Sequence, residues 1–212
     1  MPEWAALGGV AFVALFIIGL FLMFKGAPQG GDPPADFISY YGDSGNRDKI
    51  ALGWALAGLG LVLFLFFVAS LRQTVSRFDD GVLTTLTTLG GGIYAALGLA
   101  AIALDSAVRT MSDDTYQHRV YPELIHAADD AGYVMHATGG AALGVMILAA
   151  SIAFIRSGVV PKWAGWLGVV VALAAVVTIF FLTAFVWMLW IVIVAIVLFW
   201  KGAGTASSPA PS

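Results

Sequence analysis

The residues that could carry chemistry gather in one short segment, ELIHAADDAGYVMH, at residues 123–136. If a helix begins near Pro122, which suits a first helical turn, the polar side chains of this segment fall within an arc of roughly 140° at about 100° per residue. They are Glu123, His126, Asp129, Asp130, Tyr133 and His136. Glu123 and His126 stand three residues apart, a spacing that puts a carboxylate and an imidazole on one face in di-metal bundles. Such a stripe could hold Zn²⁺, Mn²⁺ or Ca²⁺.

A simpler explanation covers the same residues. A helix that leaves a membrane turns polar where it meets water, and acids in its first turn are favoured by the helix dipole. No second Glu-x-x-His exists in the sequence to complete a di-metal site. We therefore expect a solvated helix start and keep a metal site as the competing hypothesis; no particular cofactor is implied. The candidate metal ligands are Glu123, His126, Asp129 and Asp130.

His136 is the one ionisable residue within the expected membrane spans, and Asp105 stands at the end of another span. Ionisable groups are costly in lipid, so those that persist there often have a function. We expect His136 to be a hydrogen-bonded packing residue. The competing hypothesis is a ligand site or path formed by His136, Asp105 and Tyr133, in which titration of His136 would give a pH response.

The overall composition identifies the solvent of the chain. Of its 212 residues, 60% are hydrophobic and 11% charged, against about 45–50% and 25% in soluble domains. A water-soluble fold of this composition would expose large apolar patches, so we expect a multi-pass membrane protein. A pI near 5.4 and the lack of a basic run argue against nucleic-acid binding. Cysteine is absent, which excludes disulfides and thiolate chemistry. G-x-S-x-G, P-loop, HExxH and GxGxxG motifs are absent as well.

Hydropathy predicts six transmembrane helices, because about 20 apolar residues cross a hydrocarbon core of roughly 30 Å. The expected spans are about 4–24, 50–71, 82–104, 132–155, 163–181 and 183–200. The last two come from one uncharged run that would reach about 57 Å as a single helix, so we expect a reversal near residues 181–184. The prediction is a single all-α domain over residues 1–201, a polytopic six-helix bundle, followed by a disordered tail at 202–212.

The connections between these spans are unequal. Two long acidic loops, 25–49 and 105–131, alternate with short links at 72–81 and 156–162. Lysine and arginine number five on each side but are denser in the short links, which predicts cytoplasmic N- and C-termini and extracytoplasmic long loops. Within the first loop, Pro33-Pro34 and Gly42 delimit a short amphipathic helix. Its aromatic residues Phe37, Tyr40 and Tyr41 suit the level of the lipid headgroups.

Small residues at four-residue spacing predict close helix packing, either within the chain or with a membrane-protein partner or second copy. They are Gly92/Ala96, Gly132/His136/Gly140/Gly144 and Ala164/Gly168. Tryptophans lie near the expected span ends, as in an aromatic belt. They are Trp4, Trp54, Trp163, Trp166 and Trp200.

Three segments together resemble a group of uncharacterised multi-pass membrane proteins of high-GC Gram-positive bacteria, which are described only as domains of unknown function. They are ADFISYYGDSGNR at 35–47, Ser70-Leu71-Arg72, and RSGVVPKWAGWLG at 156–168. The resemblance implies a six-helix protein of the plasma membrane and supplies no activity, substrate or catalytic residue.

From the sequence we expect a non-enzymatic membrane protein that binds a partner or lipid and carries an extracytoplasmic cap. Almost pure packing chemistry within the spans and two long outer loops favour this hypothesis. The first alternative is a small transporter or ion-coupled carrier that uses His136 and Asp105. The second alternative is a metal-dependent membrane enzyme with an outer-face Glu/His/Asp site.

Overall fold

The computed structural model describes residues 3–79, 81–110, 117, 119–176 and 182–206. It is all-α, as the sequence predicts. The elements in chain order are the 3₁₀ helix η1 (Glu3–Leu7) and the α-helices α1 (Gly8–Phe24), α2 (Pro34–Gly42), α3 (Ser44–Val75), α4 (Val82–Thr110), α5 (Pro122–Ser157), α6 (Lys162–Val176) and α7 (Leu182–Ala206). Over the described residues, five helical stretches are long and apolar enough to cross a membrane.

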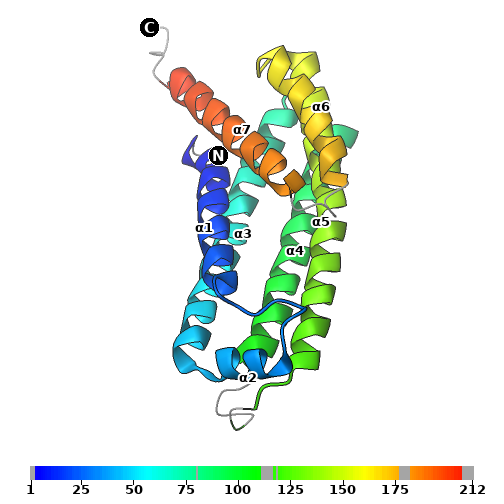
Figure 1. Ribbon diagram of the computed structural model, residues 1–212. Helices are drawn as coiled ribbons and strands as arrows, with labels where there is room; N and C mark the ends of the chain where they lie inside the picture. Colours follow the sequence, from blue (N-terminus) through cyan, green and yellow to red (C-terminus); the bar gives the residue numbers. More distant parts are fainter. Residues whose placement is uncertain (1–2, 80, 111–116, 118, 177–181, 207–212) are drawn as a thin grey trace, which may run out of the picture.

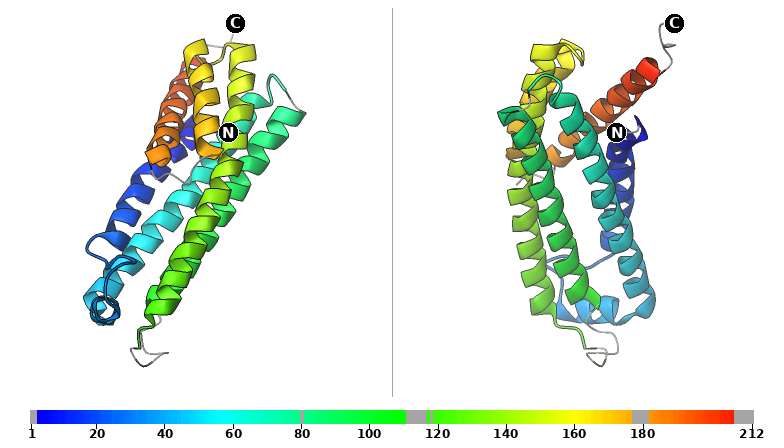
Figure 2. Two further views of the ribbon diagram at one scale, coloured as in Figure 1. Left: turned by 45° about the vertical axis from the view of Figure 1, so that its right-hand side comes forward. Right: turned by 180° about the vertical axis from the view of Figure 1, so that it is seen from behind.

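The helices form an elongated bundle with two different ends (Figure 1). α3, α4 and α5 run its length side by side, and α1 packs along α3. α2 lies across one end, which we name the α2 end, and η1, α6 and most of α7 lie toward the other (Figure 2). The predicted extended run at residues 163–200 is thus two helices, with the change between Val176 and Leu182 near the expected reversal. Residues 177–181 lie outside the described ranges.

The structure corrects several predicted helix ends. α3 begins at Ser44, six residues before the predicted span, and α4 continues to Thr110. α5 begins at Pro122, where the proline indicated a helix start, although the predicted span began at 132. Hydropathy detects the part of a helix that suits lipid, whereas the hydrogen-bonded helix continues into polar sequence where it is capped. Asp43 Oδ1, for example, accepts the Asn46 N–H at 2.9 Å at the start of α3.

The C-terminal part of the bundle also departs from the predicted limits. α6 has 15 residues, fewer than the roughly 20 that cross a bilayer, so six spans remain a prediction. α7 extends to Ala206, five residues into the segment predicted to be a disordered tail. A helix that is already formed adds further residues at little cost, so α7 continues past the apolar run although Gly202 and Gly204 are poor helix formers. Residues 207–212 lie outside the described part of the chain.

The short helix α2 forms where Pro33-Pro34 and Gly42 predicted it, but its aromatic face points into the protein. Phe37 and Tyr41 are buried, and they form a small second core with Ile50 of α3 and Ile125 of α5. Phe37 and Tyr41 therefore face the protein interior, and the position of α2 at the headgroup level stays a prediction. Their burial stabilises α2 against the bundle, because each aromatic side chain removes a large apolar area from solvent.

Two cations in the first turns of α3 hold this arrangement in place. Arg47 Nη1 donates to the carbonyl oxygens of Tyr41 at 3.1 Å and Gly42 at 2.7 Å, which satisfies the last carbonyls of α2. Lys49 Nζ donates to the carbonyl of Lys25 at 2.9 Å and to the Tyr40 hydroxyl at 2.6 Å. Two basic residues of α3 therefore fix the segment between α1 and α3 to the bundle.

Glycines set the distance between neighbouring helices. A Cβ built on Gly19 of α1 would lie 2.6 Å from the Gly53 carbonyl oxygen of α3, and one on Gly90 of α4 would lie 2.5 Å from the Ala142 carbonyl oxygen of α5. Backbones in such contact cannot accept a side chain. The predicted stripe of Gly92 differs, since a Cβ there meets nothing within 4 Å in the described chain. Gly90, two residues earlier, makes the close contact instead.

Candidate functional site

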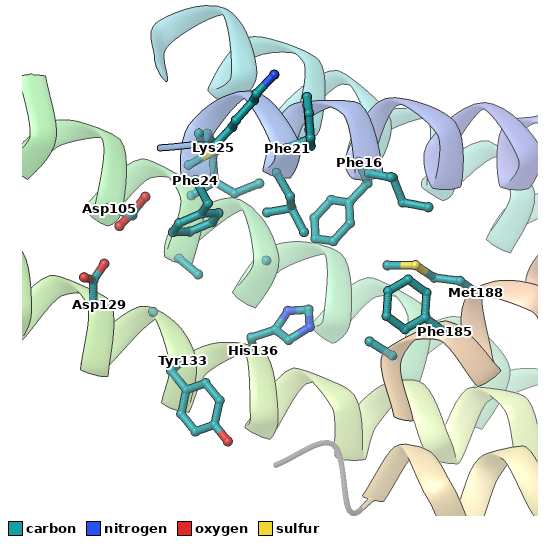
Figure 3. Close-up of a pocket in the computed structure, with 18 of the residues that line it drawn as sticks. Phe16, Phe21, Phe24, Lys25, Asp105, Asp129, Tyr133, His136, Phe185 and Met188 are labelled. Atoms are coloured by element: carbon teal, nitrogen blue, oxygen red, sulfur yellow. The ribbon is translucent and has the colours of Figure 1, made fainter. Parts of the chain in front are cut away.

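A cavity of about 790 Å³ lies between α1, α4, α5 and the first turns of α7. This volume falls within the range of roughly 300–1,000 Å³ that small-molecule sites occupy. Along α1 the lining extends from Phe16 to Lys25, about 13 Å at 1.5 Å rise per residue. The cavity is therefore an elongated space parallel to the helices, as Figure 3 shows.

Most of the cavity wall is apolar, and part of the wall is also open to the outside of the bundle. Ile17 and Phe21 of α1, Tyr133 of α5 and Phe185 of α7 line the cavity and are at the same time about half exposed. The cavity thus opens sideways between helices that are apolar enough to lie in a membrane. A molecule with an apolar chain could enter from the hydrocarbon region without crossing water.

The α2 end of the cavity is acidic. Asp105 of α4 and Asp129 and Asp130 of α5 line it there. Asp105 is buried, Asp129 is partly exposed and Asp130 is exposed. In Figure 3 the carboxylates of Asp105 and Asp129 lie close to one another beyond the ring of Phe24. The cavity therefore has a long apolar body and one polar end.

Arg109 connects these acids to α2. Its side chain is 2% exposed, and its Nε donates to Asp105 Oδ1 at 2.8 Å. Nη2 forms an ion pair with Asp129 Oδ1, and Nη1 donates to the Tyr41 hydroxyl. The guanidinium carbon lies 5.3 Å from the ring centres of both Phe24 and Tyr41, within the range of cation–π contact. One buried cation thus joins α1, α2, α4 and α5.

The Tyr41 side chain at this junction is fully buried from solvent. Burial raises the pKa of the Tyr41 phenol to about 12, even though the charge of Arg109 acts in the opposite direction. A phenol that stays neutral over the physiological range can accept from Arg109 without adding a third negative charge. α2 therefore closes the α2 end of the bundle with an apolar face that carries one neutral polar contact.

One acceptor at this junction has no partner among the described residues. Asp105 Oδ2 is buried and accepts no hydrogen bond there, although Oδ1 of the same carboxylate is paired with Arg109. A buried carboxylate oxygen without a donor is costly. Because Asp105 lines the cavity, a donor placed in the cavity would relieve this cost.

His136 lines the cavity farther from the acids, beside the aromatic core of the bundle. Its ring lies 6.2 Å from Phe16, 6.0 Å from Tyr94 and 6.4 Å from Trp187, centre to centre. Figure 3 shows the imidazole directed into the cavity. The structure shows aromatic packing of His136 and no hydrogen bond to it within the described part of the chain, so the expected hydrogen-bonded packing role is met only in its packing.

The predicted candidate residues separate into two groups in the structure. His136, Asp105 and Tyr133 line one cavity, together with Asp129 and Asp130. Glu123 is exposed, and His126 packs edge-on against Phe37 with ring centres 4.7 Å apart. Across the residues that the structure describes, no three His, Asp or Glu side chains come together to hold a metal ion. The stripe lies on one helix, α5, but Arg109 pairs with Asp129 and Phe37 of α2 packs against His126.

Sequence reasoning missed Arg109 and Tyr41. Arg109 follows Asp105 by four residues, the spacing at which opposite charges pair on a helix, so the pair itself was predictable. Its contact with Tyr41, 68 residues away in the chain, was not, because no local pattern reports what lies across from a helix face.

No known protein family, curated protein or solved structure matches this chain.

Proposed function

We propose that this protein is an integral protein of the plasma membrane that binds a lipid-like molecule without transforming it. Both termini are on the cytoplasmic side in this proposal, and the α2 end faces outward. The density of lysine and arginine in the short links supports the orientation. We also propose that the protein belongs with the uncharacterised membrane proteins that its sequence resembles.

The outer surface of the bundle supports residence in a membrane. Large apolar side chains are strongly exposed on several helices, among them Trp163 and Trp166 of α6, Leu189 of α7 and Trp4 of η1. A protein surrounded by water would bury such side chains, since each contributes about 1.5–3 kcal/mol when it leaves water. Trp187 and Trp190, by contrast, are buried inside the bundle.

The elongated cavity is the observation that carries the binding function. It is apolar along its length, opens between candidate spans and ends at a polar cluster. These are the features that an amphipathic lipid requires: a hydrocarbon-compatible body, access from the bilayer and a place for a polar head.

Ala101 of α4 offers a direct test, because its side chain lines the cavity. The variant Ala101→Phe fills part of the volume and is expected to lower the amount of lipid that remains bound after purification in a mild detergent. Native mass spectrometry measures the bound mass. Ala96→Phe is the matched control, since Ala96 is exposed on the same helix and does not line the cavity. Equal bound lipid in both variants and the parent protein would refute the proposed function.

A second candidate is an ion-coupled carrier, favoured by one observation: His136 and Asp105, an imidazole and a carboxylate, line the same cavity. Such a pair could move a proton with a substrate. Proteoliposomes that contain a pH-sensitive dye measure proton movement. His136→Ala should abolish any flux that depends on this pair, and flux equal to that of the parent protein would remove the carrier hypothesis.

A further inference from the structure

We propose that the cavity is selective for an amphiphile with an ammonium head group. The ammonium lies at Asp105, Asp129 and Asp130, and the alkyl chain extends along α1 toward His136. This inference rests on the proposed lipid-binding function and adds the chemical class of the ligand.

The charges at the α2 end favour a cation. Three carboxylates line the cavity there, and Arg109 is paired with two of them, Asp105 and Asp129. Lys25 also lines the cavity, but its Nζ lies 5.0 Å from the ring centre of Phe21. Figure 3 shows this amine directed away from the acids. The acidic end therefore carries more negative than positive charge on the side that faces the cavity.

The hydrogen-bonding groups lead to the same ligand class. Asp105 Oδ2 is a buried acceptor without a donor among the described residues, and an ammonium supplies up to three donors. Each nitrogen of Arg109 already donates one hydrogen bond: Nε to Asp105, Nη1 to Tyr41 and Nη2 to Asp129. A carboxylate or phosphate head would meet carboxylates of its own sign there. An ammonium fits, and an anion is repelled.

The apolar body of the cavity sets the other half of the ligand. Phe16, Leu20 and Met188 are among the residues that line it, and most of its wall is apolar. The length along α1, about 13 Å at 1.5 Å per residue, suits one extended alkyl chain parallel to the helices.

The test compares three probes that share one tail: dodecylammonium, dodecanol and dodecanoate. Each is titrated into the full chain in lipid nanodiscs, and the rise in unfolding temperature with probe concentration gives its affinity. We expect dodecylammonium to bind at least about tenfold more tightly than either other probe, since hydrogen bonds to charged groups are the stronger ones. Equal affinity for all three would overturn the ammonium inference and leave the proposed lipid site intact. If none bound to the parent protein, both proposals would fail.

Two substitutions locate the head group. Asp130→Asn removes an exposed carboxylate at the cavity mouth, and we expect it to lower the preference for dodecylammonium while dodecanol binding stays the same. Asp105→Asn keeps the shape of the buried side chain and should reduce the preference further. Glu123→Gln is the control. Glu123 is an exposed acid on α5, the helix of Asp130, and it does not line the cavity. An unchanged preference in both Asp variants would contradict the placement of the ammonium.

Discussion

The two halves of the bundle are built on the same helices but fill the space between them in different ways. In the half toward η1, rings from four helices meet: Phe12 stacks on Trp187 with ring centres 6.3 Å apart and an interplanar angle of 12°, and Phe64 and Tyr94 pack edge-on at 5.5 Å. In the half toward α2, the space between α1 and α5 is a cavity of about 790 Å³. His136 lies at the boundary between these two halves.

This difference shows what keeps the second half open. Buried aromatic side chains in mutual contact occupy the centre of the first half. The second half lacks such rings at its centre, but Arg109 and the apolar face of α2 close its end. Buried charges pair only at fixed geometry, so the Arg109 cluster acts as a spacer as well as a closure.

The largest expected effect comes from the removal of this spacer. Arg109→Met keeps a long apolar stem but leaves Asp105 buried without its partner, which should cost about 3–5 kcal/mol in the free energy of unfolding. Thermal or chemical unfolding in detergent measures the loss. Arg119→Met is the control, because Arg119 is exposed and such surface changes cost about 0.5 kcal/mol or less. Equal stability of both variants would show that the cavity half does not depend on the buried ion pair.

Local sequence features predicted the elements of the cavity half better than their contacts. The limits of α2 followed from Pro33-Pro34 and Gly42, and the early start of α5 followed from Pro122, because proline and glycine act on the adjacent backbone. The placement of Asp105 and His136 beside one cavity agrees with their grouping from sequence, although ligand binding itself stays a prediction.

The orientation of the same elements could not be predicted, for a physical reason. Periodicity reports which residues share a helix face, but whether lipid or protein covers that face depends on distant segments. The amphipathic pattern of α2 is the same whether Phe37 and Tyr41 face lipid or protein. Their face is buried because Ile50 and Ile125 pack against it. Gly90 and Gly92 belong to one run of three glycines, and the rotation of the helix decides which of them meets α5.

That pair of glycines gives the second prediction, which addresses the close packing shared by both halves. Gly90→Ala places a Cβ 2.5 Å from the Ala142 carbonyl oxygen and 2.8 Å from the Met146 nitrogen, backbone atoms that cannot move aside. We expect a loss of about 1–3 kcal/mol from overpacking between α4 and α5. Gly92→Ala meets nothing within 4 Å in the described chain and should be neutral or gain up to about 1 kcal/mol from helix propensity. Unfolding in detergent compares the two, and a Gly90→Ala variant as stable as Gly92→Ala would contradict the assigned interface.

The smallest expected effect concerns the neutral polar contact of α2. Burial raises the pKa of Tyr41 to about 12 from an ordinary value near 10, so the folded protein holds the phenol proton more tightly than the unfolded chain does. The stability that this proton contributes is complete below pH 10 and is lost as the pH rises from 10 to 12, at about 1.4 kcal/mol for each pKa unit of difference. Tyr41→Phe cannot ionise, so its stability should fall less than that of the parent protein between pH 9 and pH 11, at the cost of the contact with Arg109 at neutral pH. Unfolding at the two pH values measures this difference. If both proteins lost the same stability, Tyr41 would not be the group that makes the α2 end sensitive to alkali, and the contrast between a dry closure at α2 and an open cavity beside it would be weaker than the structure indicates.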